Sequence, residues 1–434
     1  MRRLIHAFAI RLYRFSISLV AVAGHAKAKG WIAMRTGSIE RLAKATGQLQ
    51  PEQKWMWFHC ASVGEFEQAR PVMEAWRALH PEDAFLLTFY SPSGWNAFAS
   101  RQPQWWRAGD HVEALPLDRS ADVKRFLRAA GGSERLGGLL LAKYDVWPNL
   151  IRALAAAKVP SGLFAGHVLH GRWPFRFGGG YQRKAWRALD RVWVQGEDSV
   201  AVLAGFGIRA AAAGDPRFDR VVQAADSCDE DAVLNEWIDQ RPCAVIGSAW
   251  DAEVGAALDA WRPGQCCLVV PHEWDAASIR AMEERWKARG ADPVIWSEHR
   301  GKDGRATLPA GDVLIVDAMG ELLALYAVAQ VAVVGGGFGQ GVHNTLEPAA
   351  HGVPVLVGPK VERFAEVEAL RQAGALAVCS KPAELSTSLS EALEDAAACQ
   401  QKGDAARAFA RHNAGAGRRI ASAWDEVVGA PQGS

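Results

Sequence analysis

A carboxylate, Glu65, follows an apolar stretch and a run of small residues in a way that suits acid–base chemistry. Ser62 and Gly64 allow a tight turn, after which Glu65 would lie in the first turn of a helix. The helix dipole favours a carboxylate there, which is a purely structural explanation. The alternative is a general base that takes a proton from a bound substrate.

A second polar group follows another apolar stretch, Leu139–Ala142. Lys143 and Asp145 come directly after it, and Pro148 then occupies a typical first position of a helix. The two charged side chains could form an ion pair on the surface. They could equally form the edge of a substrate site, since ligands of open α/β sheets bind beyond the carboxyl ends of the strands.

Two further segments could bind an anion. Arg217, within Gly214–Asp219, could meet a negatively charged ligand or could be a solvated side chain in a turn. Met319, Gly320 and Glu321 follow an apolar run and would present backbone N–H groups at the start of a helix. That arrangement suits a phosphate.

The most informative pattern is the glycine-rich stretch 331–359. An apolar run leads into five glycines within residues 335–341, which would let a ligand approach the backbone closely. The stretch has neither the position of a Rossmann fingerprint nor the Gly-Lys-Ser/Thr of a P-loop. Glycines followed by His, Asn and Glu suit a nucleotide, with N–H groups for phosphate and a carboxylate for ribose hydroxyls. The predicted nucleotide contacts are Ser248, Gly339, Gly341, His343, Asn344, Thr345 and Glu347.

Other common chemistries find little support. The histidines show no HxxxH pattern, and His167 with His170 lacks a third metal ligand, so the sequence predicts no metal site. A GxSxG nucleophile motif is absent. The seven cysteines form no CxxC pair, which is typical of a reducing compartment. A net charge of +1 argues against nucleic acid as a partner.

Alternating apolar runs and amphipathic stretches predict βαβ units and parallel sheets. The 434 residues suggest two such α/β domains facing a cleft, at 50–205 and 241–410. A linker is expected at 206–240 and a C-terminal helix at 411–434. The predicted strands are Trp55–Cys60, Ala84–Tyr90, Val112–Leu117, Gly138–Ala142, Gly162–Ala165, Val192–Gln195, Ala244–Ile246, Cys267–Val270, Val313–Val316, Val331–Val334 and Val353–Val357.

The N-terminal segment 1–30 has a different character. Residues 1–50 carry nine Lys and Arg side chains but one acid, Glu40. The longest uncharged run, Phe15–Ala26, is shorter than the ~20 residues of a spanning helix, and no clean signal-peptide cleavage site follows. A basic amphipathic helix on a membrane surface is therefore expected, the alternative being a helix docked on the protein itself. Its apolar face would comprise Leu4, Ile5, Phe8, Leu12, Phe15 and Leu19, opposite Arg3, Arg11 and Arg14.

Taken together, these motifs resemble the bacterial 3-deoxy-D-manno-octulosonic acid (Kdo) transferases of lipopolysaccharide synthesis, which are inverting glycosyltransferases of the GT-B fold. The resemblance covers nearly the whole chain. His343–Ala349 matches the family pattern His-Asn-x-Leu-Glu-Pro-Ala. The other matching segments are the basic N-terminal anchor, Ala61–Glu65, Trp147–Leu150, Gly214–Asp219, Gly247-Ser248, Met319–Leu322 and Gly341–Pro359.

This resemblance implies two Rossmann-like domains, CMP-Kdo as donor and the glucosamine disaccharide of a lipid A precursor as acceptor. It places the catalytic base at Glu65 and implies that Glu347 holds the CMP ribose. Ser62, Gly64, Lys143, Asp145 and Arg217 become possible substrate contacts. No metal or other cofactor is expected. The implied location is the cytoplasmic face of the bacterial inner membrane.

The chain departs from the family pattern at Lys143-Tyr144-Asp145, where many members read Glu-Thr-Glu. A role of the first acid therefore does not carry over, and Lys143 could meet the donor carboxylate instead. Ala249-Trp250 also replaces the commoner Thr-His. Two alternatives stay open: a GT-B transferase or sugar-nucleotide epimerase with other substrates, and a non-catalytic scaffold that binds lipid or nucleotide.

Overall fold

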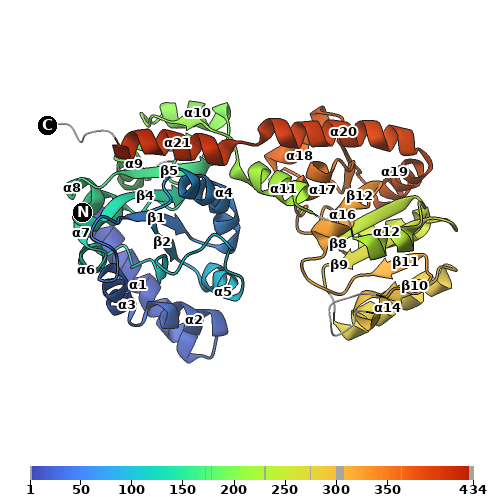
Figure 1. Ribbon diagram of the computed structural model, residues 1–434, viewed down its shortest axis with the longest axis horizontal. Coiled ribbons are helices and arrows are strands. Elements are labelled where there is room, and N and C mark those ends of the chain that lie inside the picture. The colour runs from blue at the N-terminus through green and yellow to red at the C-terminus, as the bar shows by residue number, and fades with distance from the viewer. Residues whose placement is uncertain are drawn as a thin grey trace. The chain divides into compact units, whose positions relative to one another are not determined.

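The computed structural model describes residues 2–171, 173–176, 178–228, 231–273, 275–299, 307–362 and 364–429. The chain forms two compact units (Figure 1). The first comprises the chain up to Arg220 together with the segment from Ala414 onward. The second is Val221–Asn413. Each unit is built around its own sheet.

The first unit contains a seven-stranded sheet in the order β3-β2-β1-β4-β5-β6-β7, with all neighbours parallel. Its central strands are continuous apolar runs because helices cover both faces of the sheet. The strands are β1 (Trp55–Cys60), β2 (Ala84–Phe89), β3 (His111–Ala114), β4 (Leu136–Ala142), β5 (Ser161–Gly166), β6 (Arg191–Val194) and β7 (Ala211–Ala212).

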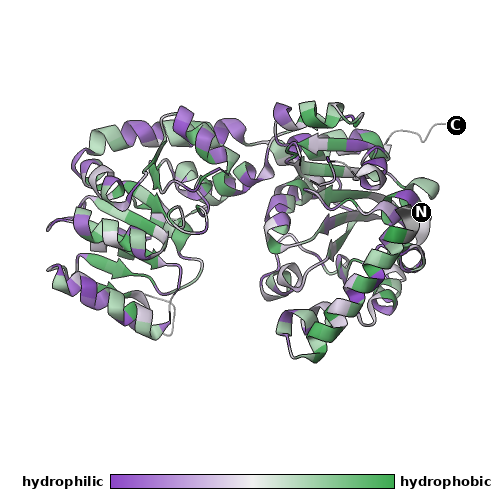
Figure 2. Cartoon of the chain, turned by 180° about the vertical axis from the view of Figure 1, so that it is seen from behind, coloured by the Kyte–Doolittle hydropathy of each residue, from purple (hydrophilic) through white to green (hydrophobic). Residues whose placement is uncertain are grey.

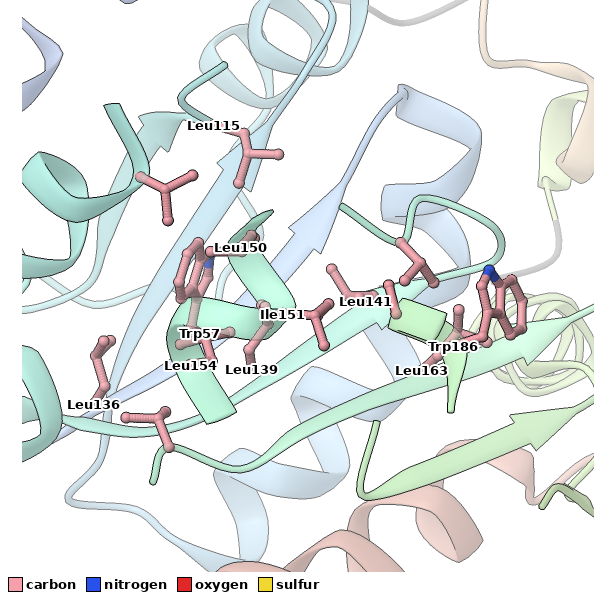
Figure 3. Packing of buried hydrophobic residues seen from close by; sticks show 14 of the residues in the cluster. Trp57, Leu115, Leu136, Leu139, Leu141, Leu150, Ile151, Leu154, Leu163 and Trp186 are labelled. Carbon is pink, nitrogen blue, oxygen red and sulfur yellow. The ribbon is translucent and has the colours of Figure 1, made fainter. Parts of the chain in front are cut away.

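Successive side chains of β1 enter two different cores, because a strand alternates its side chains between the faces of a sheet. Trp57 joins one core and Phe58 the other. In the core of Trp57, Ile151 and Leu154 of helix α8 pack against the leucines of β4 (Figure 3). The helices of this unit are α1 (Arg2–Val22), α2 (Ala26–Arg35), α3 (Ser38–Thr46), α4 (Val63–Leu79), α5 (Pro92–Ser100), α6 (Ser120–Ala129), α7 (Gly132–Arg135), α8 (Pro148–Ala156), α9 (Gly180–Trp186), α10 (Glu197–Ala204), α11 (Pro216–Asp226), which continues into the second unit, and α21 (Ala416–Gly429).

The second unit repeats this plan with a parallel sheet in the order β10-β11-β9-β8-β12-β13-β14. Ala244 and Ile246 of β8 enter one core, while Cys243 and Val245 enter the other. The prediction of two α/β units with parallel sheets is confirmed. The strands are β8 (Cys243–Ala249), β9 (Cys266–Pro271), β10 (Pro293–Ile295), β11 (Val313–Ile315), β12 (Val331–Val334), β13 (Val355–Val357) and β14 (Leu376–Val378).

The helices of the second unit lie on both faces of this sheet (Figure 1). They are α12 (Ala232–Ile238), α13 (Asp251–Ala260), α14 (Ala276–Ala288), α15 (Trp296–His299), α16 (Leu322–Ala327), α17 (Leu346–His351), α18 (Ala365–Gln372), α19 (Pro382–Glu394) and α20 (Ala396–Asn413).

The N-terminal helix α1 leaves its apolar stripe exposed (Figure 2). It docks on the first unit through other side chains: His6 Nε2 lies 2.8 Å from a carboxylate oxygen of the buried Asp118, and the rings of Tyr13 and Trp31 lie edge to face. By length and composition alone, the window Ile5–Val22 could also cross a membrane. The side chains of Arg3 and Leu4 lie outside the described residues. The exposed stripe comprises Ile5, Phe8, Leu12, Phe15, Leu19 and Val22.

The last helix, α21, packs on α4 of the first unit. Gly417 lies so close to Pro71 that an added Cβ would meet its backbone at 2.8 Å, and Trp424 is fully buried in the core that also contains Phe58. The carboxylate of Asp219 accepts hydrogen bonds from the first two amides of α21. The sequence alone does not decide which domain this helix joins.

Candidate active site

Glu65 lies at the carboxyl edge of the first sheet, where β1 ends and α4 begins. Ser62 is the residue that precedes α4, and Glu65 is in the first turn of that helix. The Glu65 carboxylate bends back and accepts a hydrogen bond from the backbone N–H of Ala61. The prediction from the small-residue run, a tight turn followed by a first-turn carboxylate, matches this geometry.

The electrostatic surroundings of Glu65 raise its pKa to about 7. Burial is the largest cause, and the negative charge of Asp145 adds to it. The N–H groups of Ala61 and Ser62 and the positive charge of Lys143 act in the opposite direction. A carboxylate with a pKa near the working pH is well suited to general base catalysis.

Lys143 and Asp145 follow β4, which is the neighbour of β1 in the sheet. Lys143 has a φ of 62°, so the chain turns sharply there, and its N–H donates to the carbonyl of Phe164. Burial raises the pKa of Asp145 to about 6. The structure therefore brings Lys143, Asp145 and Glu65 within electrostatic reach of one another at this edge.

An aromatic cluster lies next to this edge of the sheet. The rings of Tyr90 and Trp147 stack at a centroid distance of 4.8 Å. The indole N–H of Trp147 donates to Nε2 of His59 at 3.4 Å, while the other ring nitrogen of His59 contacts buried Thr88. Burial lowers the pKa of His59 to about 3, so this histidine is neutral. Trp147 follows Asp145 by two residues, so this cluster lies next to the candidate site.

Arg217 is tied to Asp215 by a short ion pair, with Nη2 to Oδ2 at 2.7 Å. The same carboxylate accepts hydrogen bonds from Gln68, one turn after Glu65 on α4, and from Gln195 beyond β6. Arg217 is therefore a partly exposed, ion-paired side chain with a defined orientation, rather than a freely solvated one.

In the second unit, the glycine-rich loop follows the central strand β12. Gly335 lies against the end of β8, where an added Cβ would meet the carbonyl oxygen of Ser248 at 2.1 Å. A Cβ added at Gly337 would meet the backbone nitrogen of Gly358, beyond β13, at 2.5 Å. Ser248 itself has a φ of 51°. Glycines are required at these positions because three strand ends pack closely together at the carboxyl edge of the sheet.

A buried carboxylate, Glu253 of α13, fixes this loop. Its two oxygens accept hydrogen bonds from the N–H of Gly336, at 3.0 Å, and of Trp250, at 3.1 Å. Glu253 was not among the site residues predicted from the sequence. The available signal was its position three residues after Trp250 at the start of a helix, which is the spacing of a capping box.

His343, Asn344 and Glu347 lie just before and within α17. The side-chain N–H of Asn344 donates to Glu347 at 2.9 Å, and its oxygen accepts from the N–H of Leu346 at 3.1 Å. The ring of His343 lies 4.9 Å from that of His272. Burial and the charge of His272 lower the pKa of His343, which favours its neutral form.

Thr345, which precedes α17, and Tyr326 of α16 are both fully buried. Both hydroxyls are buried and, among the residues that the structure describes, have no hydrogen-bond partner. The negative charge of Glu347 adds to burial in raising the pKa of Tyr326. Tyr326 also explains why residue 247 is a glycine, since a Cβ added there would meet the hydroxyl of Tyr326 at 2.2 Å.

Met319, Gly320 and Glu321 precede the short helix α16. Gly320 has a φ of 87°, and Met319 is 81% exposed, so this turn presents its backbone to solvent. Gly339 and Gly341 lie in the glycine-rich loop, which Lys360 braces by donating to the carbonyl of Gly339. All of these positions belong to the carboxyl edge of the second sheet.

Across the described part of the chain, no group of three or more His, Cys, Asp or Glu side chains could hold a metal ion. The independence from metals expected from the sequence remains a prediction.

Comparison with known proteins identifies relatives. Residues 35–220 match the family model of 3-deoxy-D-manno-octulosonic-acid transferase, or kdotransferase. The chain is 30% identical over 403 residues to the 3-deoxy-D-manno-octulosonic acid transferase of Bordetella pertussis, covering 86% of this chain and 87% of the relative. It is 27% identical to that of Aquifex aeolicus, with 78% and 86% covered.

A solved UDP-N-acetylglucosamine 2-epimerase matches the model with a TM-score of 0.55, at 12% identity, over 88% of this chain and 98% of the epimerase. At that identity the likeness shows a shared GT-B-like fold alone. The sequence relatives decide the family: this chain belongs to the 3-deoxy-D-manno-octulosonic acid transferases, as its motifs predicted.

Proposed function

We propose that this protein transfers Kdo from CMP-Kdo to the glucosamine disaccharide of a lipid A precursor, with inversion, and that Glu65 is the general base. Family membership supports the reaction. The observation that carries the role of Glu65 is its raised pKa, about 7, at a strand end beside Asp145 and Lys143.

In this mechanism the acceptor hydroxyl loses its proton to Glu65 as its oxygen forms a bond to the anomeric carbon of Kdo. The bond between that carbon and the phosphate oxygen of CMP breaks, and its electron pair leaves with CMP. Attack from the face opposite the leaving group inverts the configuration. A positioned base of this kind contributes a factor of roughly 10²–10⁴ to the rate.

The second unit supplies the proposed donor site. Backbone N–H groups around Met319, Gly320 and Glu321 and in the glycine-rich loop would stabilise the charge on the departing phosphate. Glu347, oriented by Asn344, would accept hydrogen bonds from the ribose hydroxyls. The remaining proposed donor contacts are Ser248, Gly339, Gly341, His343 and Thr345. We expect these groups to act without a metal ion.

On the first unit, Ser62 and Gly64 are proposed to contact the substrate beside Glu65. Lys143 is proposed to meet the carboxylate of Kdo, since an ammonium group here replaces the acid that many family members carry. Arg217, held by Asp215, is proposed to face an anionic group of a substrate. Asp145 tunes the basicity of Glu65.

The exposed apolar stripe of α1 supports a place at the cytoplasmic surface of the inner membrane. The helix docks on its own unit through His6 and Tyr13 and keeps Phe8, Leu12 and Phe15 in solvent. An amphipathic helix with such a stripe binds the interface of a bilayer. This location suits an acceptor that is itself a membrane lipid.

The test is incubation of the full-length protein with CMP-Kdo and a tetra-acylated lipid A precursor, with a chelator present, followed by mass analysis of the lipid. The proposal predicts a product heavier by one or more Kdo units, and no product when a UDP-sugar replaces CMP-Kdo. Transfer from the UDP-sugar instead would assign another donor. Binding of CMP without any transfer would favour a scaffold.

A further inference from the structure

A cavity of about 440 Å³ opens in the first unit, directly beside the proposed site. Its walls come from the segment that follows β4, the segment that follows β5, the loop before α9, and α9 itself. We call it the aromatic pocket. Its lining residues are Tyr144, Asp145, Val146, Trp147, His167, Val168, Leu169, Trp173, Pro174, Phe175, Gln182 and Trp186.

Most of this lining is apolar. Phe175 and Trp186 meet edge to face at a centroid distance of 5.2 Å. Among the polar side chains, Gln182 uses its N–H group on the carbonyl of Val146, and Asp145 lies at the edge shared with Glu65. The other polar groups of the wall are Tyr144, His167 and the buried indole N–H of Trp186, while eight of the twelve lining residues carry apolar or aromatic side chains. The chemistry favours a hydrocarbon ligand.

The mouth of the pocket is also apolar. Leu169 is 39% exposed, Tyr144 46% and Trp173 57%, and these three side chains belong to one opening. The guanidinium of Arg176 lies 6.0 Å from the ring centroid of Trp173. Large apolar side chains gathered at a surface opening mark a binding site more often than chance exposure. A cation beside them suits an amphiphile with an anionic head.

The pocket is physically connected to the proposed base. Trp147 lines the pocket and donates its indole N–H to His59 near the end of β1. Two residues later, the N–H of Ala61 holds the carboxylate of Glu65. Asp145 lines the same pocket. A ligand seated there would extend toward the edge at which Glu65 lies.

We propose that the aromatic pocket binds one fatty acyl chain of the acceptor, and so positions the acceptor hydroxyl at Glu65. This inference rests on the proposed function and names the part of the acceptor that the first unit recognises. It predicts that acceptor selection depends on acyl chain length. The rival occupant, the acceptor sugar ring, would show no such dependence.

The first experiment measures transfer to a series of acceptors whose amide-linked chains differ by two methylenes at each step. Burial of each methylene is worth ~0.8 kcal/mol, so KM should rise about fourfold for each methylene removed, until the chain no longer fills the pocket. The value of kcat at saturation should change little. A KM independent of chain length, alongside normal transfer, would contradict acyl-chain binding in the aromatic pocket and leave the proposed function intact.

The second experiment alters the mouth. Leu169→Asp and Trp173→Ala change partly exposed side chains, which limits damage to the fold. For long-chain acceptors we expect KM to rise about tenfold or more, with kcat retained. Leu79→Asp is the matched control, because Leu79 is a 46% exposed leucine of the same unit at the far end of α4 from Glu65. Equal effects of Leu169→Asp and Leu79→Asp would contradict the proposal.

The third experiment does not depend on transfer. Calorimetry of the full-length protein with N-lauroyl-glucosamine, below its micelle concentration, should show a saturable site that Leu169→Asp weakens about tenfold and Leu79→Asp does not. Helix α1 is unchanged in both variants, so any binding of the probe to its exposed apolar stripe contributes equally in all three proteins. Equal affinity in all three proteins would contradict acyl-chain binding in the aromatic pocket. A difference in binding without transfer to any acceptor would support the pocket and overturn the proposed function.

Discussion

The negative charge of Asp145 raises the pKa of Glu65, although one residue follows β4 and the other begins α4. They interact because β1 and β4 are neighbours in the parallel sheet, so their carboxyl ends meet at the same edge. Lys143 lowers the same pKa, and burial raises it most. The balance gives Glu65 a pKa of about 7, which leaves it both basic and substantially ionised at neutral pH.

Replacing Asp145 by Asn should shift the pH dependence of kcat/KM toward lower pH. The negative charge of Asp145 raises the pKa of Glu65, so its removal lets Glu65 ionise more readily. We expect the rising limb to move down by roughly half a pH unit to one unit. Each profile is normalised to its own plateau, so that an effect on substrate binding does not mask the shift. An unmoved limb would show that another group controls it.

Replacing Lys143 by Met should move the same limb in the opposite direction. The positive charge of Lys143 lowers the pKa of Glu65, so its loss makes the carboxylate harder to ionise. Met preserves most of the side-chain length at this left-handed position. The pair of variants forms an internal control: shifts of the same sign for Asp145→Asn and Lys143→Met would rule out electrostatic tuning of Glu65.

Stability should fall as the pH rises from about 4 to about 7. Glu65 goes from an ordinary pKa of 4.5 to about 7 in the folded state, and Asp145 from 3.8 to about 6. The folded protein therefore binds these protons more tightly than the unfolded chain, and the resulting stabilisation disappears as the pH passes through the folded-state pKa values.

Glu65→Gln should remove roughly half of that pH dependence, since the raised pKa of Asp145 supplies the rest. At pH 8 its free energy of unfolding should exceed that of the wild type by up to about 3 kcal/mol, and the difference should vanish toward pH 4.5. Glu67→Gln is the control, since Glu67 is a partly exposed residue of the same helix that pairs with Arg70 and Arg220 at 3.3 Å. Urea unfolding at both pH values measures the effect. A variant that is less stable at pH 8 would contradict the raised pKa.

Replacing Glu253 by Ala should loosen the glycine-rich loop. The N–H groups of Gly336 and Trp250 would lose their acceptors, at a cost of about 1–3 kcal/mol. If the loop holds the donor, the KM for CMP-Kdo should rise at least tenfold while the KM for the acceptor changes little. Asp251→Ala, at an exposed position of the same helix, should leave both values unchanged. An unaltered KM for CMP-Kdo in Glu253→Ala would show that the glycine-rich loop does not hold the donor.

The central strands could be predicted from the sequence because each is a continuous apolar run. The predicted Trp55–Cys60 and Val331–Val334 coincide with β1 and β12. The strands that sequence analysis missed, β7, β10 and β14, have two or three residues each and include the first and last strands of the second sheet. All three lie at an edge of their sheet. The strands β11 and β13 are just as short, but they lie inside the sheet within longer apolar runs, which made them predictable.

The candidate site residues were predictable where polar side chains come within a few residues of a strand end, as at Glu65 and Asp145, or at the end of the glycine-rich loop, as at His343. Glu253 and Tyr326 were not, because they act from within helices on backbone that is distant in sequence. The docking of α21 through Trp424 was equally hidden, since the small residues that receive this ring, Gly138 and Gly162, resemble any other glycines of a strand.

The measurement that tests the central claim most directly is single-turnover transfer by Glu65→Gln at saturating CMP-Kdo and lipid A precursor, compared with the wild type and Glu67→Gln. If Glu65 takes the proton of the acceptor, the rate of the Glu65→Gln variant should fall by roughly 10²–10⁴ while both substrates still bind. Glu67→Gln should retain the wild-type rate. A Glu65→Gln variant that transfers Kdo at the wild-type rate would contradict the account.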